Sequence, residues 1–208
     1  MRECGRSMVE MLGVLAIIGV LSVGAIAGYS KAMFKYKLNK HAEQMNTVIN
    51  AVARYVHGFS TEFWNQNLTS YFIKLGEIPV EMIRENNTDY IYDIFGNRWY
   101  VFYLYNNNGE TMNLVFNNSF LTKNSTQNLE ICRNIIVTAK ENSANIYSVS
   151  TISGHQTDEA KTGVLYGDNL CTTGSACLKN MTLEQIYDIC TKHIGTQSAE
   201  FKISWRVK

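Results

Sequence analysis

The chain has 208 residues, of which 46% are hydrophobic and 18% are charged, and its formal net charge is +1 at neutral pH. This composition suits a folded protein and argues against an intrinsically disordered one. The small net charge gives no indication of a nucleic-acid-binding protein, which would carry a basic excess. The length fits a single domain behind a membrane anchor, and the sequence contains no internal repeat.

An apolar stretch near the amino terminus is the most informative part of the chain. It runs from Gly5 to Tyr29 and contains a single acid, Glu10, after which no charge occurs until Lys31. About 20 apolar residues in a helix span the hydrocarbon core of a bilayer. A carboxylate within such a span is costly unless it is compensated, so the sequence predicts a partner for Glu10.

The order of residues in GRSMVEMLGVLAIIGVL resembles the class III leader and first helix of type IV pilins and of the pseudopilins of type II secretion. In that family a prepilin peptidase cuts after a glycine, the new terminus is methylated, and an acid at the fifth mature position is nearly universal. The resemblance implies cleavage between Gly5 and Arg6, so that residues 1–5 form the leader and Glu10 is the fifth mature residue. It further implies that Glu10 neutralises the terminal ammonium group of a neighbouring subunit in the filament, because an unpaired buried charge is costly.

Two other interpretations of this stretch remain open. The first is a plain membrane anchor, and the second is a conventional secretory signal that is cleaved after Ala27. Neither explains the spacing of Gly5 and Glu10, which favours the pilin interpretation. The positive-inside rule nevertheless conflicts with an exported head, because four lysines follow the span. They are Lys31, Lys35, Lys37 and Lys40.

From Ser30 the apolar helix is predicted to continue to His57, so that residues 6–57 form one helix with a membrane span at about 11–29. Apolar residues recur at steps of three and four along its second half, which indicates an amphipathic helix. They are Leu38, Ala42, Met45, Val48, Ile49, Val52 and Val56. The second half therefore has a stripe that can cover a sheet, whereas the first half requires lipid or other copies of itself.

Residues 58–208 are predicted to form an α+β head with an antiparallel sheet. Two runs rich in aromatic and β-branched residues, 99–105 and 112–116, predict a hairpin, and residues 93–97 predict a turn before it. Further helices are expected at 61–75, 127–141 and from 182 to Cys190, the last opened by a capping box. A strand is expected at 145–152 and a long surface loop at 154–179. Alternation in residues 201–208 predicts a final strand with one buried and one wet face.

The cysteines are also informative. Cys4 lies in the expected leader, and four other cysteines remain in the expected head. An even number in an exported domain favours two disulfides, and three pairings are possible. We expect Cys132–Cys190 and Cys171–Cys177. The first resembles the long disulfide that closes the C-terminal region of type IVb pilins. The alternative is a zinc site, which an oxidising compartment disfavours, with Cys171, Cys177, Cys190 and His193 as its ligands.

No catalytic constellation can be read from the spacing of residues, so we expect neither an enzyme nor a cofactor. The histidines are scattered at positions 41, 57, 155 and 193. Asp158, Glu159 and Asp168 fall within one polar segment and offer a candidate cation site. Ordinary solvation of a surface loop is the simpler explanation of these three acids.

Taken as a whole, the resemblance implies a structural subunit of a type IV pilus-like filament, most like type IVb pilins. The chain would lie in the bacterial inner membrane with its head in the periplasm, and would then enter an extracellular pilus. The implied partners are other pilin subunits, a prepilin peptidase, an inner-membrane assembly platform and membrane lipid. One alternative is a pseudopilin of a type II secretion system, and the other is a secreted, disulfide-bonded hydrolase or binding protein.

Overall fold

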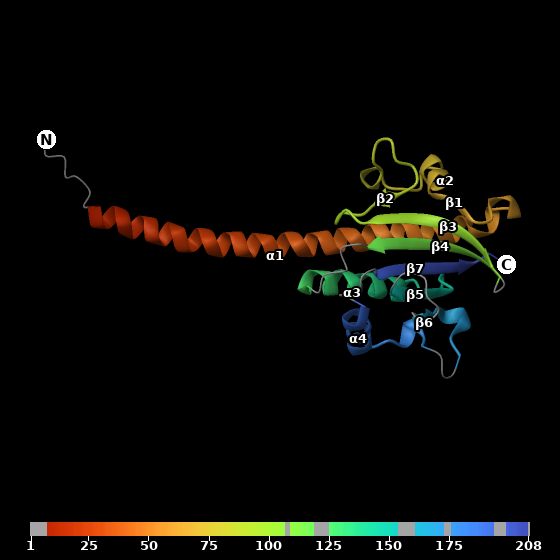
Figure 1. Cartoon of the computed structure of the whole chain (residues 1–208). Helices are drawn as coiled ribbons and strands as arrows, with labels where there is room; N and C mark the ends of the chain where they lie inside the picture. Colours follow the sequence, from red (N-terminus) through yellow and green to blue (C-terminus); the bar gives the residue numbers. More distant parts are fainter. Residues whose placement is uncertain are drawn as a thin grey trace. The chain divides into compact units, whose positions relative to one another are not determined.

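A computed structural model describes residues 8–106, 109–118, 125–153, 161–172, 176–193 and 199–207. The protein is α+β, with a long N-terminal helix whose second half packs on a seven-stranded antiparallel sheet (Figure 1). The chain divides into two compact units, Met1–Asn39 and Lys40–Lys208. The second unit begins well before residue 58, the expected start of the head, because the C-terminal half of the helix belongs to its core.

Helix α1 runs from Met8 to Tyr55 and ends in a 3-10 turn, Val56–Gly58. The amphipathic pattern predicted for its second half is confirmed, since Met45, Val48 and Ile49 are fully buried. In Figure 1 this half of α1 runs behind strands β3 and β4, and α3 lies beside α4. The other helices are α2 (Thr69–Lys74), α3 (Thr126–Glu141) and α4 (Leu183–His193).

The sheet has the strand order β1-β3-β4-β7-β5-β6, and β2 pairs with β3 beside β1. Its strands are β1 (Gln66–Asn67), β2 (Ile91–Tyr92), β3 (Arg98–Asn106), β4 (Gly109–Asn118), β5 (Ser148–Ser153), β6 (Lys161–Tyr166) and β7 (Ala199–Arg206). Register places Trp99 opposite Phe116 and Phe116 opposite Phe201. All three side chains are buried, so this row of aromatic rings forms the middle of the core.

The predicted hairpin and the turn before it are both confirmed. Strands β3 and β4 pair in antiparallel register from Arg98↔Asn117 to Asn106↔Gly109. In the turn, the Asp93 carboxylate accepts hydrogen bonds from the backbone N–H groups of Phe95 and Asn97, each at 2.8 Å. Gly96 has φ +83°, a conformation that glycine adopts without strain.

The single helix predicted for 61–75 is wrong. The segment forms a 3-10 turn (Thr61–Phe63), the short strand β1 and then α2. Asn65 has φ +57°, which breaks the helix, and the next two residues add to the edge of the sheet opposite Tyr103 and Phe102. The Asn67 side chain then accepts a hydrogen bond from the N–H of Thr69 at the start of α2. Strand pairing at this edge therefore overrides the local helical pattern.

The surface loop predicted for 154–179 is wrong in its described parts, 161–172 and 176–179. Strand β6 pairs with β5, and two 3-10 turns follow at Asp168–Leu170 and Leu178–Asn180. The wet face predicted for the last strand is also wrong at Ser204, whose side chain is buried and donates to Asn113 Oδ1 at 2.8 Å. Its buried face, with Phe201, Ile203 and Trp205, is as predicted.

The predicted capping box at the start of α4 is confirmed. The N–H of Thr182 donates to the Gln185 side chain at 2.9 Å, and the N–H of Gln185 donates to the Thr182 hydroxyl at 3.2 Å. These reciprocal bonds satisfy donors that the first turn of a helix leaves without intrahelical partners.

Candidate assembly surface

The N-terminal part of α1 presents apolar side chains around its whole circumference. Thirteen large apolar residues between positions 8 and 29 are each more than half exposed: Met8, Val9, Met11, Leu12, Val14, Leu15, Ile17, Ile18, Val20, Leu21, Val23, Ile26 and Tyr29. A helix that is hydrophobic all round is stable only in an apolar environment. By length and composition this helix is able to cross a membrane, and its most apolar stretch is not buried within the chain. It therefore requires lipid or other helices around it.

Glu10 is the acidic residue in the first turn of α1 and is exposed there. A carboxylate at this end of a helix interacts favourably with the helix dipole. The two residues expected to flank the cleavage site, Gly5 and Arg6, lie outside the described residues, as does Cys4. The structure thus describes the acid and the apolar surface around it, whereas the residues expected to flank a cleavage site are outside its described part.

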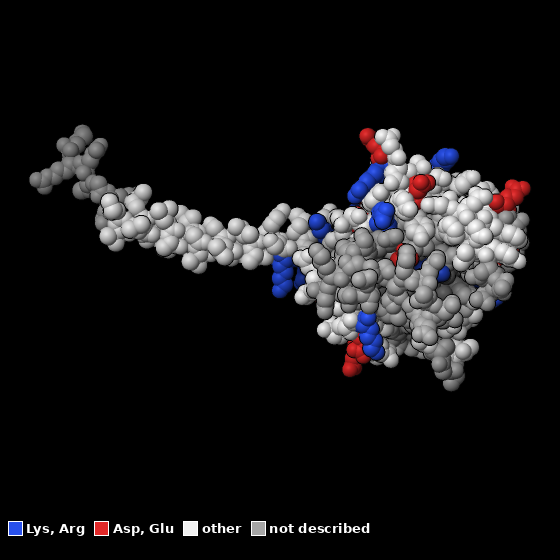
Figure 2. All heavy atoms as spheres, in the orientation of Figure 1, with Lys and Arg blue, Asp and Glu red and all other residues white. Residues whose placement is uncertain are grey.

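Lysines follow the apolar segment directly. On the face drawn in Figure 2, the apolar segment carries no coloured charged atoms, and Lys and Arg atoms first occur at its C-terminal end. Lys31 and Lys35 are exposed there, and Lys37 is partly exposed. Lysines at the end of a membrane span extend their ammonium groups to the headgroup region while their stems remain on apolar surface. Their position is therefore compatible with a span that ends near Ser30.

Within the head, Lys40 holds α1 to the 3-10 turn Val80–Met82. Its ammonium group lies 3.2 Å from a carboxylate oxygen of Glu81 and 3.2 Å from one of Glu43. The hydrogen bond to Glu81, followed by the one to Glu43, raises the pKa of Lys40 above its ordinary value. This exposed network supports the geometry at the start of the head and contributes little to stability.

Both expected disulfides are present in the structure. Cys132–Cys190 joins α3 to α4, and Cys171–Cys177 closes a small loop after β6. Zinc binding through Cys171, Cys177 and Cys190 is therefore overturned, because a cysteine in a disulfide supplies no thiolate. Among the described residues, no three potential His, Cys, Asp or Glu ligands lie close enough to hold a metal ion.

A buried polar cluster lies where α1 enters the head. The His41 ring is fully buried, with Nε2 at 3.3 Å from Asp93 Oδ2 and Nδ1 at 2.9 Å from Asn134 Nδ2. Because the Asn134 amide donates to Nδ1, the ring proton of neutral His41 lies on Nε2 and faces Asp93. A third contact is made by Gln44, whose side chain accepts from the N–H of Ile94 at 3.0 Å. The cluster ties α1 to the 93–97 turn and to α3, and its burial leaves no access for a substrate.

The structure describes only some of the other residues considered for chemistry. His57 Nδ1 lies 2.8 Å from the carbonyl oxygen of Val207, and His193 ends α4. Asp168 begins a 3-10 turn, while His155, Asp158 and Glu159 lie outside the described residues. The described part of the chain thus presents no catalytic arrangement of these groups.

Sequence reasoning missed the role of His41. Its place on the apolar stripe, four residues before Met45 and seven before Val48, indicates a buried position. Its partners Asp93 and Asn134 are 52 and 93 residues away in the chain, so periodicity along one helix could not identify them.

The chain was also compared with known proteins. No protein-family model matches it, and no curated protein and no solved structure is significantly similar to it.

Proposed function

We propose that the chain is a structural subunit of a type IV pilus-like filament. The observation that carries this proposal is the exposed apolar surface of residues 8–29, which has one acid in the first turn of its helix. A plain anchor requires the apolar residues but has no use for an acid there. The resemblance of Gly5 to Leu21 to prepilins supports the same conclusion. The α+β head with its two disulfides supports a type IVb-like subunit rather than a pseudopilin.

In the proposed pathway the subunit first lies in the bacterial inner membrane with its head in the periplasm. A prepilin peptidase removes residues 1–5, the new terminus is methylated, and an assembly platform extracts the subunit into the filament. Copies then stack in a helical, heterologous array that remains open at its ends. Their apolar segments, including Ile17 and Leu21, form the filament interior.

In this scheme, Glu10 determines the axial register in which neighbouring subunits pack. Lipid tails are as apolar as neighbouring helices, so moving the segment from lipid into a bundle gains little from the hydrophobic effect. Packing can also occur in several axial registers that differ little in energy. A pair between the Glu10 carboxylate and the terminal ammonium of a neighbouring copy is satisfied in one register alone. Any other register leaves a buried charge unpaired, which is costly.

Intact mass of the mature protein tests the processing step. The proposal predicts a chain that begins at Arg6, heavier by one methyl group where methylation has occurred. A chain that begins at Gly28 would instead identify a secreted protein released by a conventional signal peptidase. An unprocessed chain would support a plain anchor.

Substitution of the acid tests the assembly step. Glu10→Ala is expected to be processed but to give few sheared surface fibres, because the neighbouring ammonium group loses its partner. Glu43→Ala is the matched control, since it removes an exposed acid from the same helix within the head. Equal fibre yield from the Glu10 variant, the control and the native chain would argue against the charge pair.

A further inference from the structure

A band of lysines and tyrosines surrounds α1 where the apolar segment ends. It consists of Tyr29, Lys31, Lys35, Tyr36 and Lys37, which we call the collar. Tyr29 and Tyr36 are 66% and 59% exposed. Lys31 and Lys35 are exposed as well, and Lys37 is partly exposed. All five residues lie within the first of the two compact units, so the collar is a feature of the helix alone.

When α1 spans a bilayer, the length of its apolar segment brings the collar to the membrane surface. Residues 8–28 rise about 30 Å at roughly 1.5 Å per residue, which equals the thickness of the hydrocarbon core. Tyr29 therefore lies at the boundary of that core, and the lysine ammonium groups reach the headgroups beyond it. Tyrosine and lysine both suit this boundary, because each combines an apolar ring or stem with a polar end.

The collar is positively charged and has no acid near it in the sequence. No aspartate or glutamate occurs between Glu10 and Glu43. The ammonium group of Lys40, just beyond the collar, lies 3.2 Å from a carboxylate oxygen of Glu43. Lys31 and Lys35, by contrast, make no ion pair among the described residues. These two lysines are four residues apart on one face of the helix, where like charges repel each other, and an anion beside them relieves this repulsion.

The collar surrounds the helix instead of occupying one face of it. With about 3.6 residues per turn, Tyr29 and Tyr36 share one side, and Lys31 and Lys35 lie on the opposite side. Lys37 lies between the two groups. A protein that docks on one side of a helix contacts only part of such a set. A membrane surface crossed by the helix contacts the whole circumference, so the arrangement favours lipid headgroups over a protein partner.

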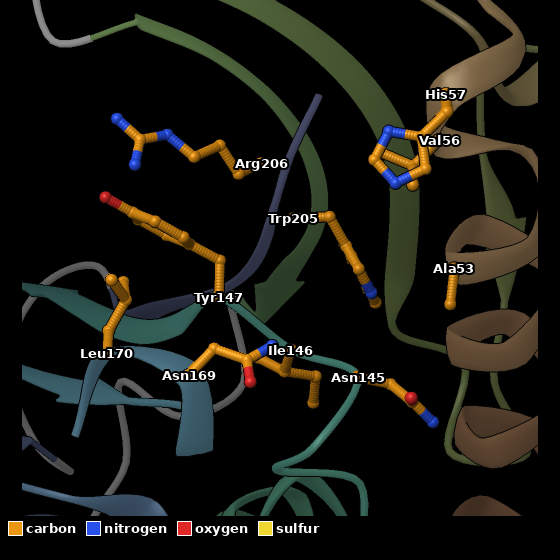
Figure 3. A pocket seen from close by; sticks show the side chains of 10 residues that line it. All are labelled: Ala53, Val56, His57, Asn145, Ile146, Tyr147, Asn169, Leu170, Trp205 and Arg206. Atoms are coloured by element: carbon orange, nitrogen blue, oxygen red, sulfur yellow. The ribbon is translucent and has the colours of Figure 1, made fainter. Parts of the chain in front are cut away.

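A pocket in the head, with a volume of about 430 Å³, offers a contrast (Figure 3). Its lining includes Trp205 and Arg206, which are consecutive on β7 and point to opposite faces of the strand. The Trp205 side chain is also almost fully buried. The lining therefore presents no single set of groups to a ligand, whereas the groups of the collar all lie at one level of the helix.

We propose that the collar binds the headgroups of anionic phospholipids, such as phosphatidylglycerol, in preference to those of zwitterionic phospholipids. The ammonium groups of Lys31, Lys35 and Lys37 contact phosphate oxygens, and the rings of Tyr29 and Tyr36 lie at the boundary of the hydrocarbon core. This inference goes beyond the proposed function. It requires only that α1 crosses a membrane, a condition that a plain anchor meets as well as a filament subunit does.

Quenching of tryptophan fluorescence by brominated lipids measures this preference. The full chain with Ile26→Trp is reconstituted in vesicles that contain equal amounts of phosphatidylglycerol and phosphatidylcholine, with each lipid brominated in turn on its acyl chains. Ile26 is 66% exposed and lies three residues before the collar begins. The chain without this substitution gives the signal of the three native tryptophans, which is subtracted. Phosphatidylglycerol is expected to bind about fivefold more tightly, because each headgroup contacts about one lysine.

The combined variant Lys31→Gln, Lys35→Gln and Lys37→Gln should bring the ratio of the two lipid affinities close to one. Added salt should likewise weaken the preference of the native collar, because it screens exposed charges.

The matched control replaces three exposed lysines of the head by glutamine, namely Lys74, Lys179 and Lys192. It removes the same charge from the chain and should keep the preference for phosphatidylglycerol. The proposal is overturned if the two lipids bind equally to the native collar, or if both triple variants have the same preference. It is also overturned if neither brominated lipid quenches the tryptophan at position 26, because the segment then lies outside the bilayer.

Discussion

At the scale of single residues, Gly167 shows how closely two backbone segments can approach. A Cβ atom added at this position would lie 1.7 Å from the carbonyl oxygen of Ile146. Backbone atoms on both sides would have to move, and the hydrogen bonds from Gly167 to Tyr147 and from Asp168 to Ser143 would be strained. The glycine is thus required by space rather than by its own backbone conformation.

Gly167→Ala is therefore expected to lower the free energy of unfolding by about 1 to 3 kcal/mol or more. Gly58→Ala provides the matched control, since a Cβ there meets no atom within 4 Å. That control should be neutral or slightly stabilising, because it reduces the entropy of the unfolded chain. Chemical denaturation followed by tryptophan fluorescence measures both, and equal stability of the two variants would refute the close approach.

Lys202 is a second residue whose surroundings predict a measurable effect. It lines a hollow on the sheet together with Tyr100, Phe102 and Glu200. Burial lowers the pKa of Lys202 below its ordinary value, and the nearby Glu200 carboxylate only partly offsets this effect. At neutral pH the charged ammonium therefore costs stability in the folded protein.

The pKa of Lys202 is lower in the folded state than in the unfolded state, where it is about 10.5. Between these two pKa values the unfolded state binds more protons than the folded state. Lys202 therefore makes the stability of the fold rise with pH in this window. Lys202→Met is expected to be more stable than the native chain at neutral pH. The difference should shrink as the pH rises through the window. Denaturation curves at several pH values measure this, and a difference that stays constant with pH would contradict the assigned cause.

At the scale of elements, the two disulfides close loops of very different length. Cys132 and Cys190 are separated by 58 positions, whereas Cys171 and Cys177 are separated by 6. In the chain-entropy model, the longer loop contributes roughly 4 kcal/mol and the shorter about 2. The longer bridge also connects two helices, α3 and α4, that pack on each other.

Replacing Cys132 and Cys190 together by alanine should therefore destabilise the head more than replacing Cys171 and Cys177. Thermal unfolding of the two double variants under identical conditions gives the comparison. The reverse order would show that native-state packing around the small loop outweighs loop entropy.

The long periodic elements could be predicted from the sequence, whereas those that depend on pairing could not. The stripe of α1, the β3–β4 hairpin and the capping box at Thr182 depend on residues close together in the chain. Strands β1 and β6 instead owe their existence to β3 and β5, which satisfy their backbone groups. Ser204 is buried for a similar reason, since its partner Asn113 lies on a neighbouring strand.

At the scale of the whole molecule, the candidate assembly surface was largely predictable, whereas the buried polar cluster around His41 was not. An unbroken apolar run with Glu10 near its start is visible in the sequence itself. That cluster combines His41 and Gln44 of α1 with the 93–97 turn and with Asn134 of α3. Only folding brings these three segments together.

The proposed function requires that the apolar segment of α1 be buried among copies of itself. A photoreactive amino acid at Ile18, which is 53% exposed within the single chain, tests this most directly in fibres sheared from producing cells. A ladder of cross-linked copies is expected, and it should be lost when Glu10→Ala is added. Recovery of the chain as an uncross-linked monomer in the membrane, with none in the sheared fibres, would contradict it.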